Sequence, residues 1–334
     1  MTNDDRDAPY VPGEFDTAPI PDDVVSPVPL DEPVIAPPET TSRRFDPRSE
    51  WFWPLVTLIG VAAVIFVNWL ANALPFNDQT TGEVLTRDPV WFQPAGWAFA
   101  IWGLIYALLV AFAVYGLLPS GRRNPVMRRI APFLLIANVA NMVWLVCWHW
   151  EYFTASLITM AILLVALIVI RVLLQADARA ARNRAAGWQN DAGSTVSRFE
   201  RWLVWPLFSI YLGWIGVASL ANLMVWWDRT GQSAGPLSLR MWTVVALVGG
   251  GIVCYVLAVI GRDGWYAAVF AFAGVAIGME QWDRSRLVST VAWLMALLEI
   301  LMVGIAIMIH TDRKPSMPRF SRRQTAVTDD TISP

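Results

Sequence analysis

The chain has few of the side chains on which enzymes and metal centres usually depend. Its 334 residues include only two Cys and two His. His149 and His310 both lie at ends of predicted helices, and no cluster has the spacing of a metal site. Cys147 and Cys254 lie within apolar runs, which does not favour a disulfide framework. A phosphate loop, a dinucleotide fingerprint and a Ser-His-Asp set are also missing. The sequence therefore favours a protein that is not an enzyme, with no catalytic residue, no metal and no required cofactor.

Charge is scarce as well, and long apolar runs take its place. Charged residues make up 16% of the chain and hydrophobic residues 56%. A hydrocarbon core about 30 Å thick needs roughly 20 apolar residues per helix, and runs of that length recur. We predict an all-α, polytopic transmembrane helix bundle of about eight spans in the lipid bilayer. The spans are expected near residues 51–74, 96–118, 130–149, 154–174, 203–226, 240–260, 264–281 and 288–309.

Both ends of the chain differ from the apolar middle. Residues 1–50 contain twelve acidic residues, four Arg and ten of the 22 Pro, a composition that cannot bury enough apolar surface to fold. We predict a disordered, acidic, Pro-rich cytoplasmic tail at 1–50 and a second disordered cytoplasmic tail at 310–334. The start lacks the features of a signal peptide, so the first span is expected to remain in the protein.

The distribution of basic residues predicts the orientation. If both termini are cytoplasmic, the inside segments hold 19 Arg and Lys, whereas the outside loops hold five Arg. Such an excess on one side is the positive-inside bias of multi-pass proteins. The sequence therefore predicts an integral multi-pass protein of a bacterial plasma membrane with both termini in the cytoplasm.

Most of the 19 Trp lie at span ends, where indoles are commonly held at headgroup depth. The third predicted helix departs from this pattern. At 100° per residue, Asn141, Trp144 and Trp148 fall within about 60° of one another and share one face. An amide at this depth either binds a neighbouring helix through a hydrogen bond, for about 1 kcal/mol, or meets a ligand.

The fifth predicted helix presents a face similar to that of the third, and the second helix is rich in aromatic residues. On the fifth, Tyr211, Trp214, Ala218 and Asn222 fall within about 80°. The second begins after a helix-breaking Pro-Ala-Gly step and then carries aromatic residues into the membrane. The faces of the third and fifth helices suit a flat, largely apolar ligand that stacks on rings and is held by a few hydrogen bonds. The aromatic residues of the second helix are Trp97, Phe99, Trp102 and Tyr106.

Together these stretches resemble the tryptophan-rich sensory proteins, the TspO/MBR family related to the mitochondrial translocator protein, or peripheral benzodiazepine receptor. The resemblance covers a five-helix bundle at residues 51–227. It departs from the family pattern where the usual double Pro is Pro94-Ala95 and where two Trp stand five apart instead of six. The matching parts are Trp91-Phe92-x-Pro94 with Trp97-x-Phe99, Trp102 and Tyr106; Asn141-x-x-Trp144; and Pro206 with Tyr211, Trp214, Ala218 and Asn222.

The resemblance implies a function. Members of the family are five-helix membrane proteins, often homodimers, that bind porphyrins, haem precursors and in some cases sterols. It implies a hydrophobic small-molecule ligand such as a porphyrin, bound for sensing or transport, and no nucleic acid. By position it nominates as ligand-binding residues Trp97, Phe99, Trp102, Tyr106, Asn141, Trp144, Trp148, Tyr211, Trp214 and Asn222.

Residues 240–309 form an additional three-helix membrane segment that the family pattern does not explain. Gly249 to Gly251 and the Gly274-x-x-x-Gly278 pair predict close helix packing in lipid. Glu299 lies near the middle of the last span, where an ionised carboxylate costs several kcal/mol. It is expected to be protonated or paired. Its role is either structural or that of a proton or substrate site.

Two alternative functions remain open at this stage. A proton-linked secondary transporter would use Glu299 as its proton site. A structural or assembly protein would instead recruit a partner through the acidic tail at 1–50.

Overall fold

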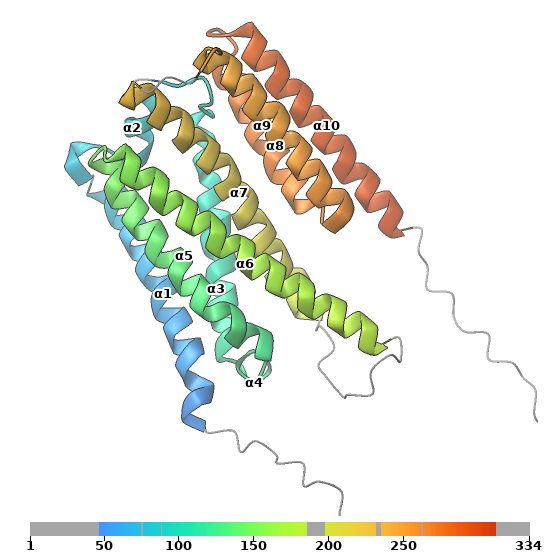
Figure 1. Ribbon diagram of the computed structural model, residues 1–334. Coiled ribbons are helices and arrows are strands. Elements are labelled where there is room, and N and C mark those ends of the chain that lie inside the picture. Colours follow the sequence, from blue (N-terminus) through green and yellow to red (C-terminus); the bar gives the residue numbers. More distant parts are fainter. Residues whose placement is uncertain are drawn as a thin grey trace, which may run out of the picture. The chain divides into compact units, whose positions relative to one another are not determined.

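A computed structural model describes residues 47–74, 76–87, 89–185, 198–231, 235–261 and 263–311. All regular elements in these ranges are helical (Figure 1), as the composition predicts for an all-α polytopic bundle. The acidic tail up to residue 46 and the second tail from residue 312 lie outside the described residues. The four residues that end the predicted first tail belong to a helix instead.

Seven helical segments in the described ranges are long and apolar enough to cross a membrane. One of them consists of the 3-10 helix η2 (Gly96–Ala100) followed directly by α3 (Ile101–Leu117). The others are α1 (Pro47–Ala73), α5 (Pro125–His149), α6 (Phe153–Ala185), α7 (Arg198–Thr230), α8 (Leu239–Gly261) and α10 (Arg286–Thr311).

The remaining predicted span is shorter than the others. Helix α9 (Trp265–Glu280) has 16 residues, which gives about 24 Å at 1.5 Å per residue against a hydrocarbon core of about 30 Å. Ten of its residues are buried, because α7, α8 and α10 pack around it. It is therefore an apolar helix enclosed by longer ones.

Two helix boundaries differ from the sequence prediction for identifiable reasons. Helix α5 begins five residues before the predicted start, because Asn124 accepts a hydrogen bond from the backbone N of Val126 at 2.9 Å and Pro125 occupies the first turn, a favoured position for proline. Helix α6 continues to Ala185, eleven residues beyond the predicted end. Its last turns carry charged residues, so they lie beyond the apolar segment but remain helical.

Helix α7 joins two groups of helices. It packs against α3 and α6 on one side and against α8 and α9 on the other (Figure 1). Within the second group, α9 and α10 approach closely at two glycines. A Cβ on Gly274 would lie 3.0 Å from the carbonyl oxygen of Ala292, and one on Gly278 would lie 2.8 Å from Nε1 of Trp293. The predicted packing role of this glycine pair is confirmed.

A buried ion pair also ties the groups together. Arg171 on α6 donates from Nη2 to Oδ2 of Asp263, in the α8–α9 turn, at 2.8 Å, and from Nε to the Tyr266 hydroxyl at 2.7 Å. The Ser209 hydroxyl on α7 donates to the same Asp263 oxygen at 2.5 Å. The Arg171 and Asp263 side chains are only 3% and 6% exposed. One network therefore connects α6, α7 and the start of α9.

Candidate functional site

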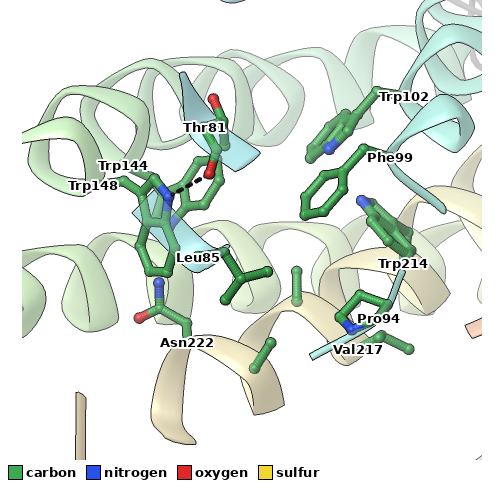
Figure 2. Close-up of a pocket in the computed structure, with 12 residues that line it drawn as sticks. Thr81, Leu85, Pro94, Phe99, Trp102, Trp144, Trp148, Trp214, Val217 and Asn222 are labelled. Atoms are coloured by element: carbon green, nitrogen blue, oxygen red, sulfur yellow. Dashed lines mark hydrogen bonds between the residues drawn. The ribbon is translucent and has the colours of Figure 1, made fainter. Parts of the chain in front are cut away.

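A pocket lies where the segment between α1 and α3 meets α5 and α7. It has about 490 Å³ of space, counting its open mouth. Figure 2 shows its lining. The residues are Thr81, Leu85, Pro94, Phe99, Trp102, Trp144, Trp148, Trp214, Val217, Ala218, Ala221 and Asn222.

Aromatic rings form two facing walls of this pocket. On α5, Trp144 and Trp148 stack with their ring centroids 5.8 Å apart and their planes 28° from parallel. Across the gap, Phe99 meets Trp214 of α7 edge to face at 6.0 Å, and Trp102 lies beside them (Figure 2). The space between the walls is therefore lined mainly by aromatic carbon.

The short helix α2 (Thr81–Thr86) covers the pocket. Its first turn is closed by a capping box, in which Thr80 and Glu83 exchange side-chain to backbone hydrogen bonds. The bonds from the Thr80 backbone and side chain lower the pKa of the Glu83 carboxyl. Trp148 donates from Nε1 to the Thr81 carbonyl at 3.1 Å, and Gln79 donates to the His149 carbonyl at 2.7 Å. Trp148 therefore both lines the pocket and holds α2 in place.

Three polar groups of the lining side chains have no hydrogen-bond partner among the described residues. They are Nε1 of Trp144, Nε1 of Trp214 and Oδ1 of Asn222. The amide nitrogen of Asn222 is satisfied, since it donates to the Ser156 hydroxyl at 2.8 Å. Buried polar groups are nearly always hydrogen-bonded in proteins. Two donors and one acceptor are therefore left for a guest in an otherwise apolar pocket.

The segment that enters the pocket before η2 is anchored by the last three helices. The backbone N of Ala95 donates to the carbonyl of Ala276 on α9 at 3.1 Å. Arg284, in the α9–α10 turn, donates from Nη2 to the Pro89 carbonyl at 2.8 Å, and its guanidinium lies 5.1 Å from the Trp91 ring centroid. Residues 240–309 thus contribute to the position of the pocket wall.

Comparison with known proteins agrees with this architecture. The family model described as TSPO-like protein matches residues 54–305, about three quarters of the chain. The chain belongs to the TSPO-like protein family. The match extends past residue 227, where the resemblance seen in the sequence motifs ends, and includes α8, α9 and most of α10. No curated protein and no solved structure matches the chain.

In this TSPO-like protein, six of the ten nominated ligand-binding residues line the pocket. Tyr106 and Tyr211 stand one layer behind it, since both rings pack on Trp102 with centroid distances of 5.5 Å and 6.0 Å. These two tyrosines therefore support the wall. The six lining residues are Phe99, Trp102, Trp144, Trp148, Trp214 and Asn222.

The remaining two nominated residues do not line the pocket. Asn141 accepts a hydrogen bond at 2.9 Å from the Asn68 amide of α1, so its carbonyl binds a neighbouring helix, one of the two roles its depth allowed. Trp97 is 44% exposed and meets Phe272 of α9 edge to face at 5.2 Å. The family motif thus splits, with Trp102 facing the pocket and Trp97 facing α9.

Sequence reasoning missed the lining residues of α2 and part of α7. The signal for α2 was present, because Thr80-x-x-Glu83 is a capping-box pattern, but the helix is only six residues long. On α7, Val217 and Ala221 follow Trp214 at steps of three and four residues and so share its face. Small residues here leave the room that the rings enclose.

Glu299 lies apart from this pocket lining, in the second group of helices. Its side chain is fully buried, and neither carboxyl oxygen has a hydrogen-bond partner within the part of the chain that the structure describes. A Cβ on Gly251 of α8 would lie 3.5 Å from its Oε1 and 3.2 Å from Sδ of Met295. Glu299 thus lies against the backbone of α8 at Gly251, with no hydrogen bond from the described residues.

Proposed function

We propose that this TSPO-like membrane protein binds a flat, largely apolar ligand of the tetrapyrrole type between the ring walls, for sensing or transport. One observation carries the proposal. Between the two ring walls, two buried indole N–H donors and one buried amide oxygen have no hydrogen-bond partner among the described residues. Stacked rings supply affinity, at about 0.5–1.5 kcal/mol per aromatic pair beyond area burial. The two donors favour a ligand with acceptors, such as carboxylates, at its edge.

Entry of such a ligand requires movement. The rings are closely set, so a molecule as wide as a porphyrin must spread the walls or displace Thr81 and Leu85 of α2. Helix α2 is only six residues long and is held by the bond from Trp148 to the Thr81 carbonyl and by the burial of Val84 and Leu85, so its release costs less than unpacking a transmembrane helix. We therefore expect α2 to be the part that yields.

The test is a titration of the purified full chain with protoporphyrin, followed by the change in porphyrin absorbance. Replacing both Trp144 and Trp214 with Leu should weaken binding roughly 5- to 150-fold, the equivalent of about 1–3 kcal/mol. Trp97→Leu is the matched control, because it removes an indole of the same motif outside the pocket. Equal losses in both variants, or no loss in either, would contradict the proposal. A porphyrin without carboxylates should bind more weakly than protoporphyrin if the indole donors meet acceptors.

Glu299 supports a second candidate function, proton-linked transport. An ionised carboxylate with no partner at this depth costs several kcal/mol, so the neutral acid is the form that its surroundings favour. A ligand flux that depends on a pH gradient across proteoliposomes should lose that dependence in Glu299→Gln. Glu280→Gln, at the end of α9, serves as the control. A flux that never responds to the gradient, or responds equally in both variants, would rule this function out.

A further inference from the structure

A second cavity lies at the opposite ends of α3 and α5. It has about 290 Å³ of space, counting its mouth. Met127 in its lining is 17 residues from Trp144 along α5, or about 25 Å at 1.5 Å per residue, so the two cavities lie near opposite ends of the spans. We call it the arginine pocket. Its lining consists of Trp53, Pro54, Thr57, Phe112, Gly116, Gly121, Arg122, Met127, Arg128 and Ala131.

Two arginines border this pocket, and one of them has an unmet donor. The short helix α4 (Pro119–Arg122) brings Arg122 to the rim by a close backbone approach, since a Cβ on Gly121 would lie 2.1 Å from the Tyr115 carbonyl oxygen. Nε of Arg122 lies 3.6 Å from a Glu50 oxygen, beyond hydrogen-bonding distance. It is buried and has no hydrogen-bond acceptor among the described residues. Arg128, on the first turns of α5, borders the same space.

Apart from Thr57, the rest of the lining is apolar. Trp53 and Pro54 of α1, Phe112 of α3 and Met127 of α5 all border the pocket. A Cβ on Gly116 would meet no atom within 4 Å, which shows that the groove beside α3 has room for hydrocarbon. The arginine pocket therefore joins a cationic rim to an apolar groove.

The position of the pocket decides what can occupy it. It lies where one span ends at Leu117 and the next begins at Pro125, which is the level of a bilayer surface. Residues 119–131 contain four Arg and no acidic residue, and the carboxylate of Glu50 pairs with Arg122 at the rim. Basic pockets between transmembrane helices are suited to lipid phosphates, and arginines near a membrane surface attract anionic lipids.

We propose that the arginine pocket binds one anionic phospholipid, with the lipid phosphate on Arg122 and Arg128 and an acyl chain in the groove beside Gly116. Charge complementarity supplies the headgroup contact, and burial of the chain against Trp53 and Phe112 supplies the rest. The lipid would fill space between α1, α3 and α5 at the end of the bundle away from the ring walls.

The test measures binding of phosphatidylglycerol to the full chain in neutral detergent, with retained lipids counted by native mass spectrometry. Replacing both Arg122 and Arg128 with Gln should weaken binding about thirtyfold, from roughly fivefold per arginine at a membrane surface. The matched control replaces Arg123 and Arg129, which carry the same charge in the same segment but are exposed. That control should cost less than about threefold, because exposed charges contribute little.

Two further arms distinguish the outcomes. Gly116→Leu fills the groove without changing charge, and it should weaken phosphatidylglycerol binding while leaving the fold intact. Phosphatidylcholine with the same acyl chains and inorganic phosphate alone should each bind far more weakly. If both double-arginine variants lost the same affinity for phosphatidylglycerol, the lipid would be held by the overall positive charge of the segment and not by this pocket. Binding of phosphate as tight as that of the lipid, or no effect of Gly116→Leu, would also overturn the proposal.

Discussion

Replacing Asp263 with Ala would leave the Arg171 guanidinium buried without its counter-charge. The Asp263 carboxylate accepts hydrogen bonds from Arg171 at 2.8 Å, from Ser209 at 2.5 Å and from the Trp265 backbone N at 3.1 Å. Removing one partner of a buried pair typically costs about 3–5 kcal/mol. Arg171 is only 3% exposed, but a long side chain near a span end can extend toward the surface. We therefore expect the lower end, about 3 kcal/mol, a large part of a total stability of roughly 5–15 kcal/mol.

Removing both charges should cost less than removing one. Replacing a buried ion pair with apolar residues of similar size is often neutral, so Arg171→Met combined with Asp263→Ala should recover most of the loss. The cation–π contact of Arg171 with Trp205, at 4.5 Å, would still be lost, which leaves about 1 kcal/mol unrecovered.

The assay is unfolding of each variant in mixed detergent and SDS micelles, followed by far-UV circular dichroism. Asp283→Ala, in the exposed α9–α10 turn, is the control and should change stability by less than about 0.5 kcal/mol. The reasoning is refuted if Asp263→Ala behaves like this control, or if the double variant is as unstable as the single one.

Three further predictions concern local contacts. Because the pKa of the Glu83 carboxyl is lowered in the folded protein, the carboxylate stabilises the first turn of α2 at pH values above the ordinary carboxyl pKa, and this stabilisation is lost as the pH falls through the lower folded pKa. Hydrogen exchange of the Glu83 amide, corrected for its intrinsic rate, should therefore become faster in acid. In Glu83→Gln the corrected exchange rate should depend less on pH. Gly278→Leu would drive a side chain into Trp293, and thermal unfolding should show a loss of about 1–3 kcal/mol, whereas an unchanged midpoint would mean that α9 and α10 can separate freely. Asn68→Leu leaves the Asn141 carbonyl without its donor and should cost about 1 kcal/mol in the same assay, with no change in porphyrin affinity.

The spans were predictable because hydrocarbon imposes a simple requirement on the sequence. Apolar length located the seven segments of the described residues that are long enough to span a membrane and also the shorter helix α9, and family motifs located most of the ring walls. The predicted helix ends were wrong where features other than the hydrocarbon thickness determine where a helix begins or ends. Helix α5 begins at its Asn124 cap and not at the last charge before its apolar run, and α6 continues beyond its apolar window because charged residues such as Asp177 and Arg179 are compatible with helix outside the lipid.

The side-chain directions were harder to predict than the helices. Its angular position on the helix placed Asn141 on the same face as Trp144. This did not predict its contact, because the Asn141 side chain accepts a hydrogen bond from Asn68 on another helix. Which neighbour a polar group meets depends on tertiary packing that a single helix does not encode. The same holds for Trp97, which meets Phe272 from a segment 175 residues away. Its place in a family motif could not reveal that α9 would be its contact.

The contacts between α9 and the first segment suggest why this protein retains residues 240–309. Residues 89–95, which lead to Pro94 and Phe99 in the pocket wall, are not part of a helix. The position of this wall therefore depends on the contacts that hold residues 89–95. Helix α9 supplies a backbone acceptor to Ala95, and Arg284 bonds the Pro89 carbonyl. These are contacts that a five-helix bundle could not make.

The consequence can be tested at a residue that does not line the pocket. Arg284→Ala removes its hydrogen bonds to the segment, each worth about 0.5–1.5 kcal/mol, and should loosen the wall, weakening protoporphyrin binding severalfold without changing the unfolding midpoint much. Arg286→Ala is the control, because that guanidinium packs on Trp282 instead, 4.2 Å from the ring centroid. If both variants bind protoporphyrin like the unmodified protein, the last three helices do not shape the pocket, and their role must be sought at Glu299.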